Sequence, residues 1–126
     1  MGISTQHNVR VTAHEITNIT LVNIQGSLSS TTSAQGIQDL QRVLDRGARK
    51  LVINLAELDY ISSAGLHMFL ILSKRLRHVQ GELKISNAKG MVHESFGVSG
   101  VNAMIQLCDT DEDAVAAFKA PMTPPG

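Results

Sequence analysis

The sequence predicts an α/β fold in which about four helices pack on a central mixed sheet of four to five strands. Short runs rich in Val, Ile and Leu alternate along the chain with longer segments whose apolar residues recur at helical spacing. The first two strand-like runs are joined by a short link, which favours antiparallel pairing. Later runs are separated by helices, which favours parallel pairing.

Five segments are predicted as strands because they are short, rich in β-branched or aliphatic residues, and bounded by polar residues or glycine. They cover residues 8–13, 18–25, 51–55, 82–86 and 104–107. The run 51–55 is apolar except for Asn54, a pattern typical of a strand that is buried on both faces.

Four helices are expected between and after these strands. They are one opened by Thr32–Gln35 and ended at Gly47, one from Ser63 to about Val79, one over 91–96 stopped by Gly97, and one capped by Thr110 and running to Phe118. The first begins with Thr-Ser-Ala-Gln, which resembles a capping box, because the side chains of its first and fourth residues can each bond the other's backbone amide.

Charge and composition exclude several classes of partner. The chain has 126 residues with 11 basic and 11 acidic side chains, so it has no electrostatic footprint for nucleic acid or an anionic membrane. No apolar segment approaches the length of a membrane span, and the single cysteine, Cys108, cannot form an internal disulfide. We therefore expect a cytoplasmic protein without a nucleic-acid or membrane partner. Residues 120–126, with two adjacent prolines, are expected to form a flexible tail.

Neither a metal nor a cofactor is expected. The five histidines show no His-x-x-x-His spacing, and no paired cysteines are present. The glycines are scattered along the chain, so no glycine-rich loop is available to hold a phosphate.

Two adjacent serines, Ser62 and Ser63, stand between the strand 51–55 and the following helix. Serine favours a helix start because its hydroxyl oxygen can accept from the free amides of the first turn. The same amides and the helix dipole favour an anion such as a phosphoryl group. A solvent-facing hydroxyl at this place either attacks a substrate or is itself modified.

Catalysis by either serine is disfavoured. A nucleophile elbow requires Gly-x-Ser-x-Gly, but the residue two before Ser63 is Ile61, and Ser62 lacks both flanking glycines. The downstream histidines precede the carboxylates at 109–113, so the chain order Ser, Asp, His of that fold is also missing. We therefore do not expect an enzyme.

The segment 58–66, Leu-Asp-Tyr-Ile-Ser-Ser-Ala-Gly-Leu, resembles the signature of the STAS domain, which is shared by bacterial anti-sigma factor antagonists and the cytoplasmic tails of sulfate transporters. Weaker similarities follow in the family's order, at residues 20–28, 81–88, 98–101 and 111–118. The resemblance implies one STAS domain over residues 8–119.

In the regulatory branch of that family, the serine two residues before the signature glycine is phosphorylated by a partner kinase. Counting back from Gly65 places the phosphate on Ser63, with Ser62 as the alternative. The unphosphorylated form would bind an anti-sigma factor that is also a serine kinase of the histidine-kinase-like ATPase type, and so release its client. Phosphorylation would reverse binding, and a metal-dependent serine phosphatase would reset the switch.

The resemblance also implies a partner-binding surface around the serines. It consists of Ser29, Ser30, Thr31, Ser62, Ser63, Ala64, Gly65 and His67. The loop from Ser27 to Ser33 carries six hydroxyls, and in STAS domains the corresponding loop lies beside the serine and contacts the kinase. Such loops also serve simply as turns and caps.

Three further points are open at this level. Gly65 would either let a partner approach the backbone or pack the helix closely on its own sheet. His67, with Lys74 and His78, falls on the face of the helix that carries Ser63, and this stripe is either part of a docking surface or an ordinary solvated face. Many family members carry Asp where this chain has Asn54 and Ser62.

Two other functions fit the same resemblance. One is a STAS subunit of a lipid or anion transport system, and the other is a scaffold subunit of a stress-signalling assembly.

Overall fold

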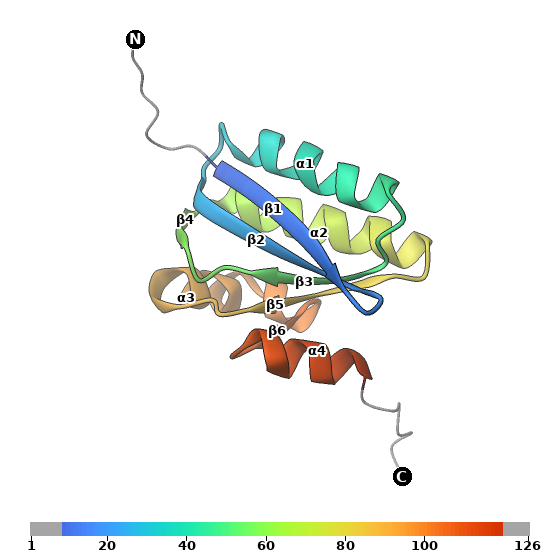
Figure 1. The fold of residues 1–126 in the computed structure, drawn as a ribbon. Helices are drawn as coiled ribbons and strands as arrows, with labels where there is room; N and C mark the ends of the chain where they lie inside the picture. The colour runs from blue at the N-terminus through green and yellow to red at the C-terminus, as the bar shows by residue number, and fades with distance from the viewer. Residues whose placement is uncertain (1–8, 120–126) are drawn as a thin grey trace.

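The computed structural model describes residues 9–119 as a six-stranded sheet with four helices (Figure 1). The strands are β1 (Val9–Ile16), β2 (Ile19–Leu28), β3 (Lys50–Asn54), β4 (Leu58–Ile61), β5 (Glu82–Ser86) and β6 (Gln106–Cys108). The helices are α1 (Ser33–Asp45), α2 (Ser63–His78), α3 (Gly90–Ser99) and α4 (Asp111–Lys119), with a 3₁₀ turn at Val101–Ala103. The tail predicted to be flexible, 120–126, lies outside the described residues, as does position 8.

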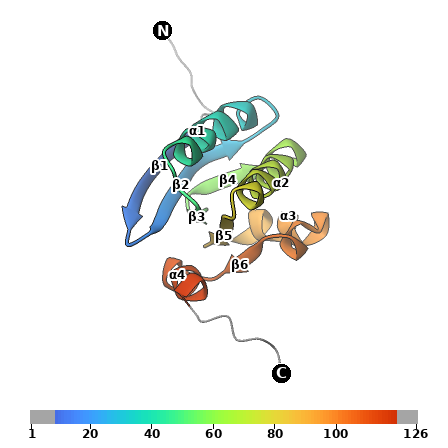
Figure 2. The same cartoon turned by 90° about the vertical axis from the view of Figure 1, so that its right-hand side faces the viewer.

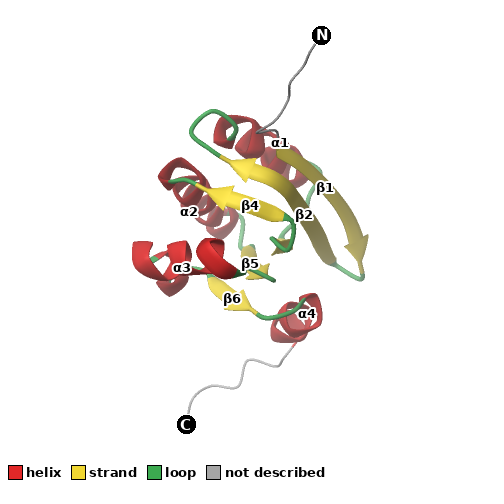
Figure 3. Ribbon diagram, turned by 90° about the vertical axis from the view of Figure 1, so that its left-hand side faces the viewer, coloured by secondary structure: helices red, strands yellow, loops and turns green. Residues whose placement is uncertain are grey.

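The sheet is mixed, as the sequence predicts. Its strand order is β1-β2-β3-β5-β6, with β1 antiparallel to β2 and the other neighbours parallel. Strand β1 pairs with one edge of β2 from Ile19 to Gly26. On the other edge, β3 pairs with Thr20–Asn23, and β4 pairs in parallel with Gly26–Leu28 after a register shift (Figure 3).

Strand β4 is the element that the sequence patterns do not predict. It has only four residues, and its two central residues, Asp59 and Tyr60, are exposed. Its pairing with β2 holds the chain in place: the Gly26 amide donates to the Glu57 carbonyl at 3.1 Å. As a result, the carboxyl ends of β2 and β4 lie side by side, directly before α1 and α2.

The helices cover the two faces of the sheet unequally. Helices α1 and α2 pack side by side on one face, and α4 lies on the opposite face (Figure 2). Strand β3 is buried on both faces as predicted, because Leu51 and Ile53 join the large core while Val52 packs in the smaller core beneath α4. Phe69 and Phe96, with ring centroids 5.7 Å apart, join α2 to α3. This contact links α3 to α2, and α3 also packs on β4 and the 3₁₀ turn.

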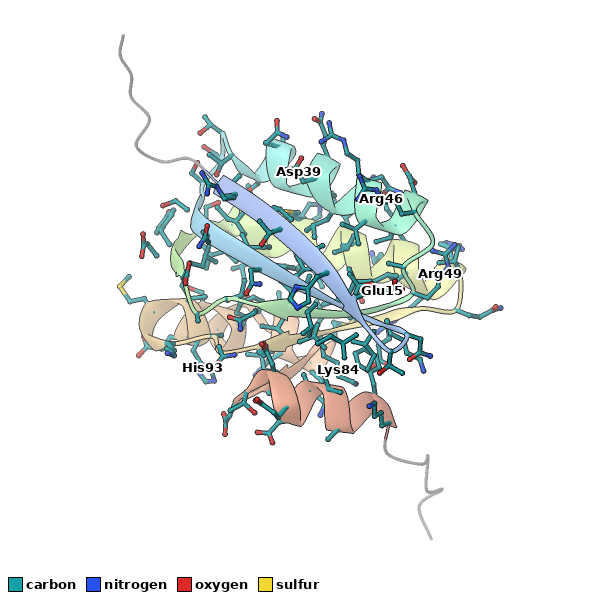
Figure 4. All side chains as sticks on the ribbon, viewed as in Figure 1. Glu15, Asp39, Arg46, Arg49, Lys84 and His93 are labelled. Atoms are coloured by element: carbon teal, nitrogen blue, oxygen red, sulfur yellow. The ribbon has the colours of Figure 1, made fainter. Side chains whose placement is uncertain are left out.

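Lys84 is buried beneath α4, where its aliphatic stem lies among the residues of the smaller core (Figure 4). Its ammonium bonds Glu82 and Gln106, each at 2.8 Å, and lies 4.6 Å from the centre of the Phe118 ring. A buried charge requires such partners, and the contact with Phe118 links α4 to β5.

Two details of the helix ends differ from the sequence-based prediction. Thr32 precedes α1, but its hydroxyl donates to the Ser27 carbonyl instead of accepting from the helix, and Gln35 bonds Asp39. The predicted capping box is therefore wrong, because the loop itself uses the threonine. Helix α3 also continues through Gly97 and ends at Gly100, whose φ of 81° suits the left-handed cap.

Candidate functional site

Ser62 is the N-cap of α2 and is occupied by that role. Its hydroxyl oxygen accepts a hydrogen bond from the Gly65 amide at 3.2 Å, and its own amide donates to the Leu28 carbonyl at 2.8 Å. The first bond satisfies a free amide of the first turn, and the second ties the helix start to the end of β2. Ser62 therefore has the helix-capping role that serine favours at such a position.

Ser63 is the first residue of α2 and differs from its neighbour. Its side chain is exposed, and within residues 9–119 no hydrogen bond occupies its hydroxyl. Its place at the carboxyl edge of the sheet leaves this hydroxyl facing solvent at a helix N-terminus. The hydroxyl is thus accessible to an enzyme that would modify it.

The loop between β2 and α1 lies beside the serines, and its hydroxyls mainly stabilise the loop itself. Thr32 Oγ1 donates to the Ser27 carbonyl at 2.6 Å and accepts from the Ser29 amide at 2.8 Å. Ser29 Oγ lies 3.0 Å from Thr31 Oγ1, while Ser30 and Thr31 remain exposed. The turn-forming role is therefore present, and it leaves hydroxyls on the surface.

Tyr60 stands between two hollows in this surface and is 49% exposed. The first hollow, of about 450 Å³, is formed by Tyr60 and the loop residues Ser27, Ser29, Ser30 and Thr31. The second, of about 540 Å³, is lined by Tyr60, Ile61, Ser62, Ser63, Leu66, Met91, Glu94, Ser95, Val98 and Ser99. The predicted loop and serine residues thus belong to one continuous surface.

Gly65 is buried and packs against the molecule's own strands. A Cβ atom at this position would lie 2.8 Å from Ile61 Cγ1, 2.9 Å from Leu28 Cβ and 3.1 Å from the Leu28 carbonyl oxygen. Of the two roles considered for this glycine, the geometry supports close packing of the first turn. Ala64 beside it is half-buried.

His67 is exposed one turn after Ser63, and Lys74 and His78 are exposed further along α2. No hydrogen bond or ion pair engages any of the three within the described part of the chain. This stripe has the properties of a solvated helix face, and its role in docking stays a prediction.

The electrostatics of the site come from the helix ends. Neither α1 nor α2 has an acidic residue in its first turn, whereas α4 has three, Asp111, Glu112 and Asp113. The positive ends of α1 and α2 are therefore not neutralised by acidic side chains of their own first turns. Of the residues that line the two hollows, Glu94 is the one charged side chain.

The sequence patterns do not identify the contribution of α3. Met91, Glu94, Ser95 and Val98 follow each other at helical spacing and form one wall of the second hollow. One signal was present in the sequence: α3 has more apolar residues than its buried face needs, because Val92 and Phe96 already form that face.

Within residues 9–119, no group of three His, Cys, Asp or Glu side chains is placed to hold a metal ion. In the same range, no helix combines the length and apolar character needed to cross a bilayer.

Burial raises the pKa of the Cys108 thiol, so this cysteine is a poor nucleophile.

Solved structures place this architecture in a known class. An anti-sigma factor antagonist from Mycobacterium paratuberculosis superposes with a TM-score of 0.83 at 19% identity, covering 93% of this chain and 99% of that one. The anti-sigma factor antagonist SpoIIAA in its unphosphorylated form gives 0.73 at 19% identity, covering 90% and 100%. The chain therefore has the α/β fold of anti-sigma factor antagonists.

The chain belongs to the STAS domain family, whose pattern it matches over residues 10–114. A relative from Bordetella bronchiseptica, BtrV, named as a candidate anti-sigma factor antagonist, is 38% identical over 111 residues, which are 88% of this chain and 96% of the relative. The murine anion transporter Slc26a9 contains a similar fold, with a TM-score of 0.74 and 16% identity over 85% of this chain and 18% of the transporter.

Proposed function

We propose that this chain is an anti-sigma factor antagonist whose binding is switched off by phosphorylation of Ser63. The observation that supports Ser63 over Ser62 is the difference between their hydroxyls. Ser62 is engaged in capping α2, whereas Ser63 is exposed and its hydroxyl is free within the described residues. A kinase can reach Ser63 without breaking a bond that the helix needs.

In this proposal the unphosphorylated surface binds an anti-sigma factor of the histidine-kinase-like ATPase type, which is also the serine kinase. The contact surface comprises the Ser29–Thr31 loop, the start of α2 and the two hollows on either side of Tyr60. Binding occupies the anti-sigma factor and frees its client. The antagonist is substrate and ligand in this cycle, and it works in the cytoplasm because its partner does.

The phosphate has opposite effects on the stability of the free protein and on the stability of the complex. At the N-terminus of α2 its charge is favoured by roughly 0.3–1 kcal/mol. In a closed interface an unpaired charge costs on the order of 3–5 kcal/mol, which corresponds to a loss of roughly 10²–10³ in affinity. The interface term is larger, so the complex separates while the domain stays folded. A metal-dependent phosphatase then restores the hydroxyl.

A role as the STAS subunit of a transport system is less well supported. The likeness to Slc26a9 concerns a small part of that chain at 16% identity, so it bears on the fold alone. The relative at 38% identity is named for the antagonist function and matches over nearly its whole length.

The direct test is to incubate the protein, with and without ATP, with an anti-sigma kinase of the histidine-kinase-like ATPase type from the same organism, and to map phosphate by mass spectrometry. We expect a stable complex without ATP and one phosphate on Ser63 with it. Absence of both binding and labelling would contradict the proposed function.

A further inference from the structure

Helix α3 has two apolar faces, and only one of them is used by the fold. Val92 and Phe96 are buried and pack in the core. On another face, Met91 is 75% exposed and Val98 is 90% exposed. These two residues are seven apart, so they lie two turns from each other along one side of the helix. Apolar side chains exposed to this degree bury little surface within the domain.

The exposed apolar residues gather at the phosphorylation site. The large apolar side chains exposed on the described residues are Ile16, Tyr60, Val79, Met91, Val98 and Met104. Three of them, Tyr60, Met91 and Val98, line the same hollow as Ser62 and Ser63. This hollow is therefore continuous with the surface assigned to the partner in the proposed function.

We infer that the hollow between the start of α2 and α3 receives an apolar side chain of the anti-sigma kinase, flanked by a Lys or Arg that pairs with Glu94. The inference rests on the proposed function and extends it to α3. Glu94 is the only charged side chain that lines the hollow. Once a partner covers the hollow, this carboxylate loses water, and a cation on the partner is the group that compensates it.

The same arrangement explains why a phosphate on Ser63 finds no partner in the interface. Glu94 and Ser63 line one hollow, and no Lys or Arg is among its lining residues. Glu94 pairs with the Lys or Arg that the kinase brings. A phosphate on Ser63 therefore finds no cation left to pair with. Glu94 is therefore a positioning residue of the switch, and it sets the difference in affinity between the two forms.

The experiment compares calorimetric binding of matched variants to the same ATPase. Because Val98 is nearly fully exposed, Val98→Ala should leave the melting temperature unchanged, yet we expect the double variant Met91→Ala, Val98→Ala to bind about tenfold more weakly or worse. Val79→Ala makes the same substitution as Val98→Ala at an exposed valine just after α2, and it should bind like the wild type. Glu94→Gln should weaken binding of the unphosphorylated form and shrink the affinity gap between unphosphorylated and phosphorylated protein by at least about threefold.

The outcomes separate the two proposals. If the wild type is phosphorylated on Ser63 while the α3 variants bind within twofold of it, the inference is wrong and the proposed function stands. If Glu94→Gln leaves the affinity gap unchanged, Glu94 has no part in the switch and the inference is likewise overturned. If ultracentrifugation shows a dimer that Val98→Ala abolishes, the occupant is a second copy of the chain, which also overturns it. If the wild type neither binds nor is labelled, both proposals fail.

Discussion

The side-chain amide of Asn54 donates to both carboxylate oxygens of Asp111, at 3.1 Å each. The Ser86 hydroxyl donates to the same carboxylate at 2.5 Å. Asp111 lies in the first turn of α4, so these bonds attach that helix to the carboxyl ends of β3 and β5. An aspartate at position 54 would therefore place one carboxylate against another.

We therefore expect Asn54→Asp to lower the free energy of unfolding by roughly 1–3 kcal/mol at neutral pH, because it replaces a donor by a like charge. Two carboxylates side by side favour the uptake of one shared proton, so the loss should narrow as the pH falls from neutral toward about 4. Urea unfolding at several pH values measures this. Asn54→Ala is the control, and an Asp variant no less stable than the Ala variant would refute the role of charge.

Substitution of the two serines should separate modification from capping. Ser63→Ala should abolish labelling by the kinase and leave stability nearly unchanged. Ser62→Ala should reduce labelling several-fold at most and lower the free energy of unfolding by about 1 kcal/mol, because the Gly65 amide loses its acceptor. Phosphate mapping and urea unfolding of both variants test this, and full labelling of Ser63→Ala would move the site to Ser62.

Two glycines should respond to alanine with opposite signs. Gly65→Ala should cost roughly 1–3 kcal/mol of unfolding free energy, because the new methyl group meets Ile61 and Leu28 at less than 3.0 Å. Gly97→Ala should gain about 0.5–1 kcal/mol, because Gly97 lies within a helix and its nearest neighbour is Asn102 Nδ2 at 4.0 Å. Thermal unfolding compares them. A Gly65→Ala protein as stable as the wild type would remove the packing role.

The variant Ser63→Asp should act as a weak copy of phosphorylation. Its single charge is smaller than the −1.5 to −2 of phosphoserine, so binding to the kinase should fall by less than it does on phosphorylation. Melting should be nearly unchanged, since a negative charge is favoured at a helix start. Calorimetry and melting of wild type, phosphoprotein and variant decide this. Equal affinity of all three would contradict the switch, and a collapsed melting temperature would indicate unfolding.

The sequence was sufficient for the elements that carry an apolar pattern of their own. Strand β3 follows from a short apolar run, and α2 follows from apolar residues at helical spacing. Strand β4 does not, because four residues with two exposed side chains show no period, and their pairing depends on where β2 happens to run. The predicted capping role of Thr32 is wrong for a similar reason: its hydroxyl bonds the carbonyl of Ser27, which the sequence pattern does not place nearby.

The candidate site likewise has one part that the sequence predicts and one part that only the structure reveals. The serine pair and the hydroxyl loop are local in sequence and were identified there. The wall formed by Met91 and Val98 was not, because an apolar residue in a helix is normally taken as core. Only the position of α3, fixed by the Phe69–Phe96 contact, shows that these two side chains lie outside it.

The tight fit of Gly65 against Leu28 and Ile61 also bears on how genomes are interpreted. Selection for folding alone would retain this glycine in a duplicated copy that had lost its kinase, because any side chain there disturbs the seat of α2. The glycine therefore reports on the packing of the fold, while the hydroxyl two positions earlier reports on the proposed control by phosphorylation. A copy that keeps the first and replaces the second should be classified as a STAS domain without being counted as a phosphorylation switch.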